Sequence, residues 1–188
     1  MASKIILLKK RCVIITSFLV YLILFVVLSG VSQNISKQYI VSQQEDGLLY
    51  FINPQEGWNS KKVKAELIYD ITYNTSNDSL VFNFSLLTKQ NIYPEGICVI
   101  NGSDSLSSQV NKIYIDTQKS KYHYRYTTIF TFDDYYTLIK HDTSQALIII
   151  YLKNNDPVVL TISKNQWLKQ RDILVRIFNL IALNKDSV

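Results

Sequence analysis

The sequence predicts a mainly β protein: an antiparallel, sandwich-like domain of about seven or eight strands with a C-terminal amphipathic α-helix, preceded by an N-terminal transmembrane helix or signal segment. Three observations predict this fold class. Apolar and polar residues alternate with a period of two from Leu48 onward, clusters of turn-forming residues separate these stretches, and the period changes near Ser163 to that of a helix. Short strands joined mostly by tight turns favour an antiparallel sandwich or a strongly curved sheet.

The N-terminal segment is the most distinctive part of the chain. Residues 12–28 contain thirteen Leu, Ile, Phe or Val residues and no charged residue. With residues 29–32 included, the apolar run reaches about 20 residues, which is long enough to span a bilayer as a helix. We expect residues 12–32 to be a transmembrane anchor or a signal peptide.

Basic residues immediately before this run set its expected orientation. Lys9, Lys10 and Arg11 precede the apolar segment, and cationic flanks stay on the cytoplasmic side. Residues 1–11 are therefore expected in the cytoplasm, with the domain outside it, in a periplasm or beyond the cell. Cleavage near Ser32, after the small residues Gly30-Val31-Ser32, would instead release a secreted domain.

The rest of the chain divides into a polar stalk, residues 33–47, and a β-rich domain, residues 48–188. The firmest local prediction is a hairpin, because residues 63–73 and 80–87 alternate in polarity and are separated by the turn sequence Asn74–Ser79. Further strands are expected near residues 48–52, 96–101, 110–116, 122–132, 145–152 and 157–162. The run 146–152 lacks alternation, which predicts a strand covered on both faces.

Two helices are expected near the C-terminal end. Ser163 and Gln166 fit a capping box that opens a helix over residues 163–184. Asp133 and Asp134 are expected to cap a short helix over residues 135–140. In the long helix Trp167, Leu174, Ile177, Phe178 and Ile181 share one side, which needs a cover: the domain's own sheet, a partner protein or a membrane surface.

The net charge of +5 is concentrated before the domain. Four of the twenty basic residues lie within the first eleven positions, whereas the first acidic residue is Glu45. The remaining sixteen basic and fifteen acidic residues nearly cancel, so the domain lacks the strongly basic balance of a nucleic-acid-binding protein. No nucleic-acid partner is expected.

Catalytic and metal-binding patterns are poorly represented. His123 and His141 are the sole histidines, and Cys12 and Cys98 do not form a pair with metal-ligand spacing. No nucleophile elbow or glycine-rich phosphate loop occurs. We therefore expect no cofactor and no metal, and interpret Cys98 as a buried core residue.

Aromatic and apolar residues supply the candidate contact sites. Trp58 lies in the stretch Asn53–Asn59, which reads as a loop, where a tryptophan could contact a ligand or partner. The full set of candidate contact residues is Trp58, Trp167, Leu174, Phe178 and Ile181. The stripe Tyr122, Tyr124, Tyr126, Phe130 and Phe132 is interpreted as core, with a stacking platform as the alternative.

These observations favour a membrane-anchored, extracytoplasmic binding or assembly module that catalyses nothing and contacts another envelope or surface protein. The membrane itself is a partner through residues 12–28. Two alternatives stay open: a secreted domain that binds a carbohydrate or peptide, and an enzyme whose catalytic residues come from distant strands.

Overall fold

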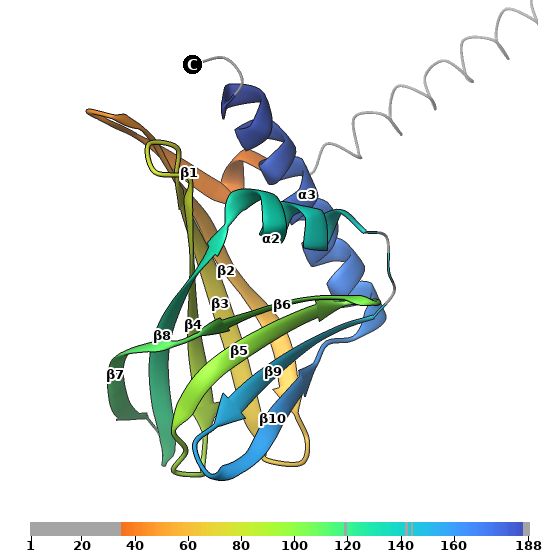
Figure 1. Cartoon of the computed structure of the whole chain (residues 1–188). Coiled ribbons are helices and arrows are strands. Elements are labelled where there is room, and N and C mark those ends of the chain that lie inside the picture. The colour runs from red at the N-terminus through yellow and green to blue at the C-terminus, as the bar shows by residue number, and fades with distance from the viewer. Residues whose placement is uncertain (1–34, 119, 142, 144, 186–188) are drawn as a thin grey trace, which may run out of the picture. The chain divides into compact units, whose positions relative to one another are not determined.

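A single antiparallel sheet of ten strands forms the body of the protein in the computed structural model, which describes residues 35–118, 120–141, 143 and 145–185 (Figure 1). The sheet curls strongly and replaces the predicted two-layer sandwich. The amino-acid pattern could not distinguish the two, because both give strands with one buried face and one exposed face. The expected membrane segment and its basic flank lie outside the described residues.

Strands and helices alternate in blocks along the chain. The strands are β1 (Tyr39–Gln44), β2 (Gly47–Ser60), β3 (Ala65–Asn74), β4 (Ser79–Thr88), β5 (Pro94–Asn101), β6 (Asp104–Gln109), β7 (Asn111–Gln118), β8 (Lys121–Thr131), β9 (Ala146–Leu152) and β10 (Asn155–Thr161). The helical elements are η1 (Ile35–Lys37), α2 (Phe132–Lys140) and α3 (Lys164–Lys185). The sheet order is β6-β5-β9-β10-β2-β3-β4-β8-β7, and β1 pairs with β2.

The hairpin of β3 and β4 confirms the firmest sequence prediction. Ile71 pairs with Phe82, and the same register continues from Glu66 with Leu87 to Asn74 with Ser79. Leu80, Phe82 and Phe84 are completely buried. Because side chains alternate between faces, this register leaves Asn83 on the opposite face of the sheet.

Strands β6 and β7 explain the curl of the sheet. They occupy opposite ends of the strand order, yet Val110 alone separates them in sequence. The Val110 amide donates to the Glu95 carbonyl at 3.1 Å, and the Thr128 hydroxyl donates to the Gln109 carbonyl at 2.7 Å. The segment between β6 and β7 is therefore hydrogen-bonded both to β5, near one end of the sheet, and to β8, near the other.

Both predicted helices are present, with one different cap. The Gln166 amide donates to the Ser163 hydroxyl at 3.4 Å, which confirms Ser163 as the N-terminal cap of α3, and that hydroxyl donates to Gln166 Oε1 at 2.8 Å. Helix α2 begins earlier than predicted, and its N-cap is Thr131 instead of the aspartates. Asp134 completes this cap, because its amide donates to the Thr131 hydroxyl and its carboxylate accepts from it.

Helix α3 packs within its own domain, the arrangement that the sequence favoured. Trp167 is 2% exposed, and Leu174, Ile177, Phe178 and Ile181 are fully buried. The Phe178 ring stacks on Phe132 of α2 with centroids 5.2 Å apart, so the two helices share one aromatic cluster. The apolar side of α3 is thus covered by the same chain.

Three local predictions need correction. Part of the expected stalk is strand β1, whose Tyr39 pairs with Ile52 of β2. Strand β6 was missed because its sequence, Asp104–Gln109, is almost entirely polar. Strand β9 is not covered on both faces: its residues alternate between buried and partly exposed, and Tyr151 is 45% exposed.

Candidate functional site

Trp58, predicted to lie in a loop, is a buried strand residue. It belongs to β2 and is 1% exposed, and its ring lies 5.9 Å from that of Trp167. Two register shifts between Ile52 and Trp58 let β2 accommodate the Pro and Gly residues that suggested a loop. The loop prediction is therefore wrong, and the indole is part of the core.

The other candidate contact residues, on α3, are buried as well. Trp167, Leu174, Phe178 and Ile181 are between 0 and 2% exposed. The structure brings Trp58 and Trp167 together, while Phe178 lies in the cluster with α2. None of the five offers its side chain to solvent in this structure, so a surface for a partner must be sought elsewhere.

The remaining predicted positions divide into two groups. Lys9, Lys10 and Arg11 lie outside the described residues, and within those residues no helix has the length and apolar character needed to cross a bilayer. Cys98 is 4% exposed, and Tyr124, Tyr126, Phe130 and Phe132 are core residues, as interpreted from the sequence, whereas Tyr122 of the same stripe is only partly buried. His123 packs edge-on against the Tyr114 ring at 5.3 Å.

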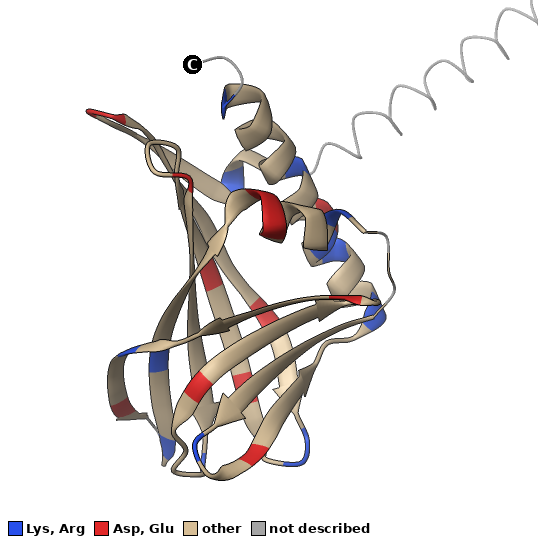
Figure 2. Cartoon of the chain, in the orientation of Figure 1, with Lys and Arg blue, Asp and Glu red and all other residues tan. Residues whose placement is uncertain are grey.

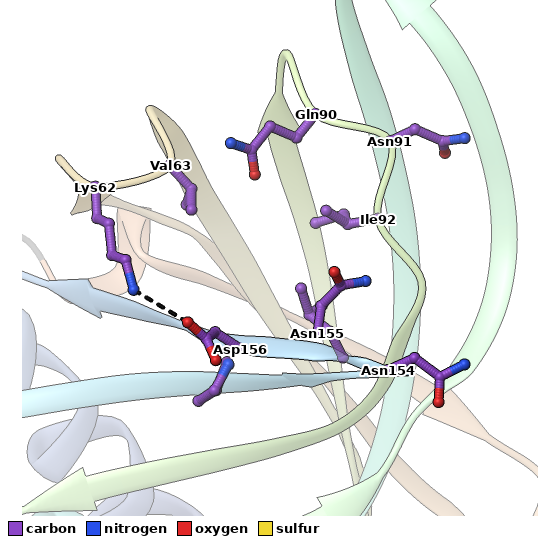
Figure 3. Close-up of a pocket in the computed structure, with 10 residues that line it drawn as sticks. Lys62, Val63, Gln90, Asn91, Ile92, Asn154, Asn155 and Asp156 are labelled. Carbon is purple, nitrogen blue, oxygen red and sulfur yellow. Dashed lines mark hydrogen bonds and ion pairs between the residues drawn. The ribbon is translucent and has the colours of Figure 1, made fainter.

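A wide recess lies at the end of the sheet away from α2. We call it the turn-end pocket (Figure 3). It has a volume of about 550 Å³ and is lined by the β2–β3 turn, the β4–β5 loop and the β9–β10 turn. Its polar lining consists of Lys62, Gln90, Asn91, Asn154, Asn155 and Asp156.

Side-chain amides dominate this lining, and one ion pair crosses it. Lys62 Nζ lies 3.4 Å from Asp156 Oδ2, as the dashed line in Figure 3 shows. Both side chains are more than three-quarters exposed, so this pair contributes at most about 1 kcal/mol to stability. A ligand could therefore displace either partner at little cost.

A buried tyrosine holds the β4–β5 loop in place. The Tyr124 hydroxyl accepts from the Ile92 amide at 3.0 Å and bonds to Asn91 Oδ1 at the same distance. Burial raises the pKa of this phenol, and so it stays a neutral donor at ordinary pH. Asn91 Nδ2 in turn donates to the Tyr93 hydroxyl at 3.2 Å, which steadies an aromatic ring that is 54% exposed.

A second recess, the lysine groove, adjoins the pocket. It has a volume of about 350 Å³ and is lined by Lys61, Lys64, Lys89 and Lys121, with Glu66 as its acidic residue. These lysines sit at the ends of β2, β3, β4 and β8, which are consecutive in the sheet. Figure 2 shows the resulting blue positions at the turns of this end.

No family model, curated protein or solved structure matches the chain.

Sequence reasoning missed both recesses because their residues come from turns far apart in the chain. Lys61, Lys64, Lys89 and Lys121 span about a third of the sequence. The near-zero net charge of the domain gave no indication of them, because acidic residues elsewhere in the chain balance these lysines. The one local signal was the run Lys61-Lys62-Val63-Lys64.

Proposed function

We propose that this protein is a membrane-tethered, extracytoplasmic binding module, and that the turn-end pocket with its adjoining lysine groove is its binding surface. The anchor and its orientation follow from residues 12–28 and the basic residues before them. The observation that carries the binding role is the pocket itself, a recess of about 550 Å³ lined by amide and charged side chains.

The lining favours binding over catalysis. Gln90, Asn154 and their neighbours donate and accept hydrogen bonds but neither attack a substrate nor exchange protons near neutral pH. The described lining of this pocket contains no serine, threonine, cysteine or histidine, and its one carboxylate, Asp156, is paired with Lys62. In the described residues, no group of three or more potential metal ligands gathers there or elsewhere.

The position of the ligand differs from the one the sequence suggested. The candidate contact residues on the apolar side of α3 are buried within the domain and are not accessible to a partner. A polar recess framed by three turns suits a surface or envelope component that presents hydroxyl or charged groups.

Cysteine footprinting in living cells tests location and binding together. Gln90 is exposed and lines the pocket, whereas Lys169 is exposed on α3. Each would be replaced by cysteine in a chain carrying Cys12→Ser, where the native Cys98 is buried. A membrane-impermeant maleimide is then added to intact cells and, separately, to the purified chain.

We expect Lys169→Cys to react at the same rate in both settings, and Gln90→Cys to react more slowly in cells because a ligand covers it. Labelling of neither variant until the cells are lysed would contradict the extracytoplasmic location. Equal rates for Gln90→Cys in cells and in solution would contradict binding at the pocket.

The secreted alternative is compatible with the same site. Cleavage near Ser32 would leave every described element intact, because the described elements begin at Ile35. The mass of the mature chain decides between the two, since retention of residues 1–32 supports the anchor.

A further inference from the structure

The four lysines of the lysine groove place like charges at the ends of consecutive strands. Neighbouring strands in a sheet are about 4.8 Å apart, and charges in physiological salt interact over about 8 Å. Lys61 and Lys64 flank the β2–β3 turn, Lys89 follows β4, the strand next to β3, and all three line the same groove. Side chains of like charge on neighbouring strands destabilise a sheet.

The domain supplies little to offset this repulsion. Lys121 lies 2.8 Å from Glu66, the groove's acidic residue. Among the described residues, no carboxylate comes within ion-pair distance of Lys61, Lys64 or Lys89. An external anion would neutralise the three remaining charges.

Backbone geometry adds to the case at Lys64. Its φ of +49° lies in the left-handed region, which glycine and asparagine adopt far more readily than lysine. The turn therefore carries a lysine where local conformation favours another residue.

An exposed aromatic ring lies beside the turn-end pocket, on the β4–β5 loop, because its hydroxyl accepts from the pocket residue Asn91. Tyr93 is 54% exposed, and Asn91 holds its hydroxyl. Lys89 precedes it by four residues, and the amides of Gln90 and Asn91 lie between them in the pocket lining. A flat ring flanked by amides suits the apolar face and hydroxyl groups of a sugar ring.

We infer that the lysine groove and the turn-end pocket together bind an anionic glycan, whose sulfate, phosphate or carboxylate groups lie on Lys61, Lys64 and Lys89 while a sugar ring packs on Tyr93. This inference rests on the proposed function and names its ligand class. The unpaired lysine charges are the reason for proposing an anionic ligand. The exposed Tyr93 ring and the neighbouring amides are the reason for proposing a glycan.

Binding of defined polymers to the purified full chain in a neutral detergent tests the inference. The probes are dextran sulfate, polygalacturonate, uncharged dextran and a single-stranded DNA oligonucleotide. We expect the two charged glycans to bind, with an affinity that falls as salt is added, and uncharged dextran and DNA to bind at least about tenfold more weakly.

Matched triple variants locate the site. Lys61→Gln, Lys64→Gln and Lys89→Gln remove three groove charges, whereas Lys112→Gln, Lys164→Gln and Lys169→Gln remove three exposed charges elsewhere. We expect the groove variant to bind dextran sulfate about tenfold more weakly or worse, and the control to change by less than about twofold. Glu66→Gln should tighten binding, because it removes the groove's carboxylate, which competes with the ligand for Lys121.

Four outcomes would overturn the inference: equal losses in both triple variants, absence of charged-glycan binding, DNA binding as tight as glycan binding, or unchanged glycan affinity in Tyr93→Ala. These outcomes are separate from a failure of the proposed function. Slow labelling of Gln90→Cys in cells with no binding of either charged glycan would refute the glycan alone.

Discussion

The indole Nε1 of Trp58 donates a hydrogen bond to Oε1 of Gln170 at 3.2 Å, and this contact joins β2 to α3 across 112 positions of the chain. Gln170 Nε2 also donates to the carbonyl of Glu56. Among the described strands, none pairs with this part of β2 on one side, because β1 ends its pairing at Ile52 and β10 reaches only Asn59. The glutamine amide therefore completes an interrupted sheet edge.

Replacing Gln170 with leucine should lower the free energy of unfolding by about 1 to 3 kcal/mol, because the buried Trp58 N–H would lose its acceptor and the partly buried Glu56 carbonyl its donor. The exposed neighbour offers a control, and Lys169→Ala should change stability by less than about 0.5 kcal/mol. Urea unfolding of the full chain measures both. Similar values for the two variants would show that the bridge to β2 contributes nothing.

The β3–β4 hairpin gives a test of register. Phe82 is fully buried and stacks on Tyr69 with centroids 4.6 Å apart, so Phe82→Ala should cost about 3 to 5 kcal/mol. Asn83, on the other face, donates to Asp70 Oδ1 at 3.0 Å in a partly exposed position. Asn83→Ala should cost less than about 1 kcal/mol, and equal shifts in thermal unfolding would contradict the register.

Buried tyrosines make the domain sensitive to alkali. Tyr69 and Tyr135 lie in the core, and burial raises the pKa of both phenols above the ordinary value of 10. The unfolded chain therefore releases these protons first. Their contribution to stability is complete below about pH 10 and is lost as the pH rises toward the folded pKa.

Each such group should steepen the loss of unfolding free energy above pH 10 by up to about 1.4 kcal/mol per pH unit. Tyr69→Phe removes one of them, so its stability should fall less steeply with pH than that of the unmodified chain. Urea unfolding between pH 9 and about pH 11.5 measures the slopes. Identical slopes would mean that Tyr69 does not titrate above its ordinary range.

The residues before the apolar segment should fix the topology. Replacing Lys9, Lys10 and Arg11 with glutamate should reduce or invert export of the domain, because cationic flanks are retained in the cytoplasm. Replacing Lys112, Lys164 and Lys169 with glutamate changes the charge equally but leaves the flank intact. Protease digestion of intact cells reports the orientation, and unchanged digestion of the flank variant would refute this assignment.

Local pattern predicted most of the fold. The alternation in residues 63–87 specified both the hairpin and its buried face, and the Ser163 capping box specified the start of α3. The same pattern failed to predict the second half of β2 and all of β6. Register shifts in β2 and the polar composition of β6 remove the alternation of apolar and polar residues on which the prediction depends. The choice between sandwich and curled sheet depends on where Val110 carries the chain, and no single stretch encodes that.

The site was much less predictable than the fold. The sequence prediction selected Trp58 and the apolar side of α3 as contact residues because their side chains are large and apolar, yet Trp58 and Trp167 pack against one another in the core. The recesses depend instead on turns whose lysines and amides look like ordinary solvated residues in sequence. Lys61, Lys64 and Lys89 lie at the same end of the sheet only because β2, β3 and β4 are neighbours in it.

The most direct test of binding at the turn end is a residue-by-residue map of ligand contact. Amide resonances of the isotope-labelled full chain in neutral detergent would be followed by NMR while a short dextran sulfate is added. We predict that the largest shifts fall in the turns and loops at residues 60–66, 89–93, 121–122 and 153–157, while α2 and α3 stay unchanged. Shifts centred on the β1–β2 hairpin or on α3, or spread evenly over all exposed lysines, would contradict the account.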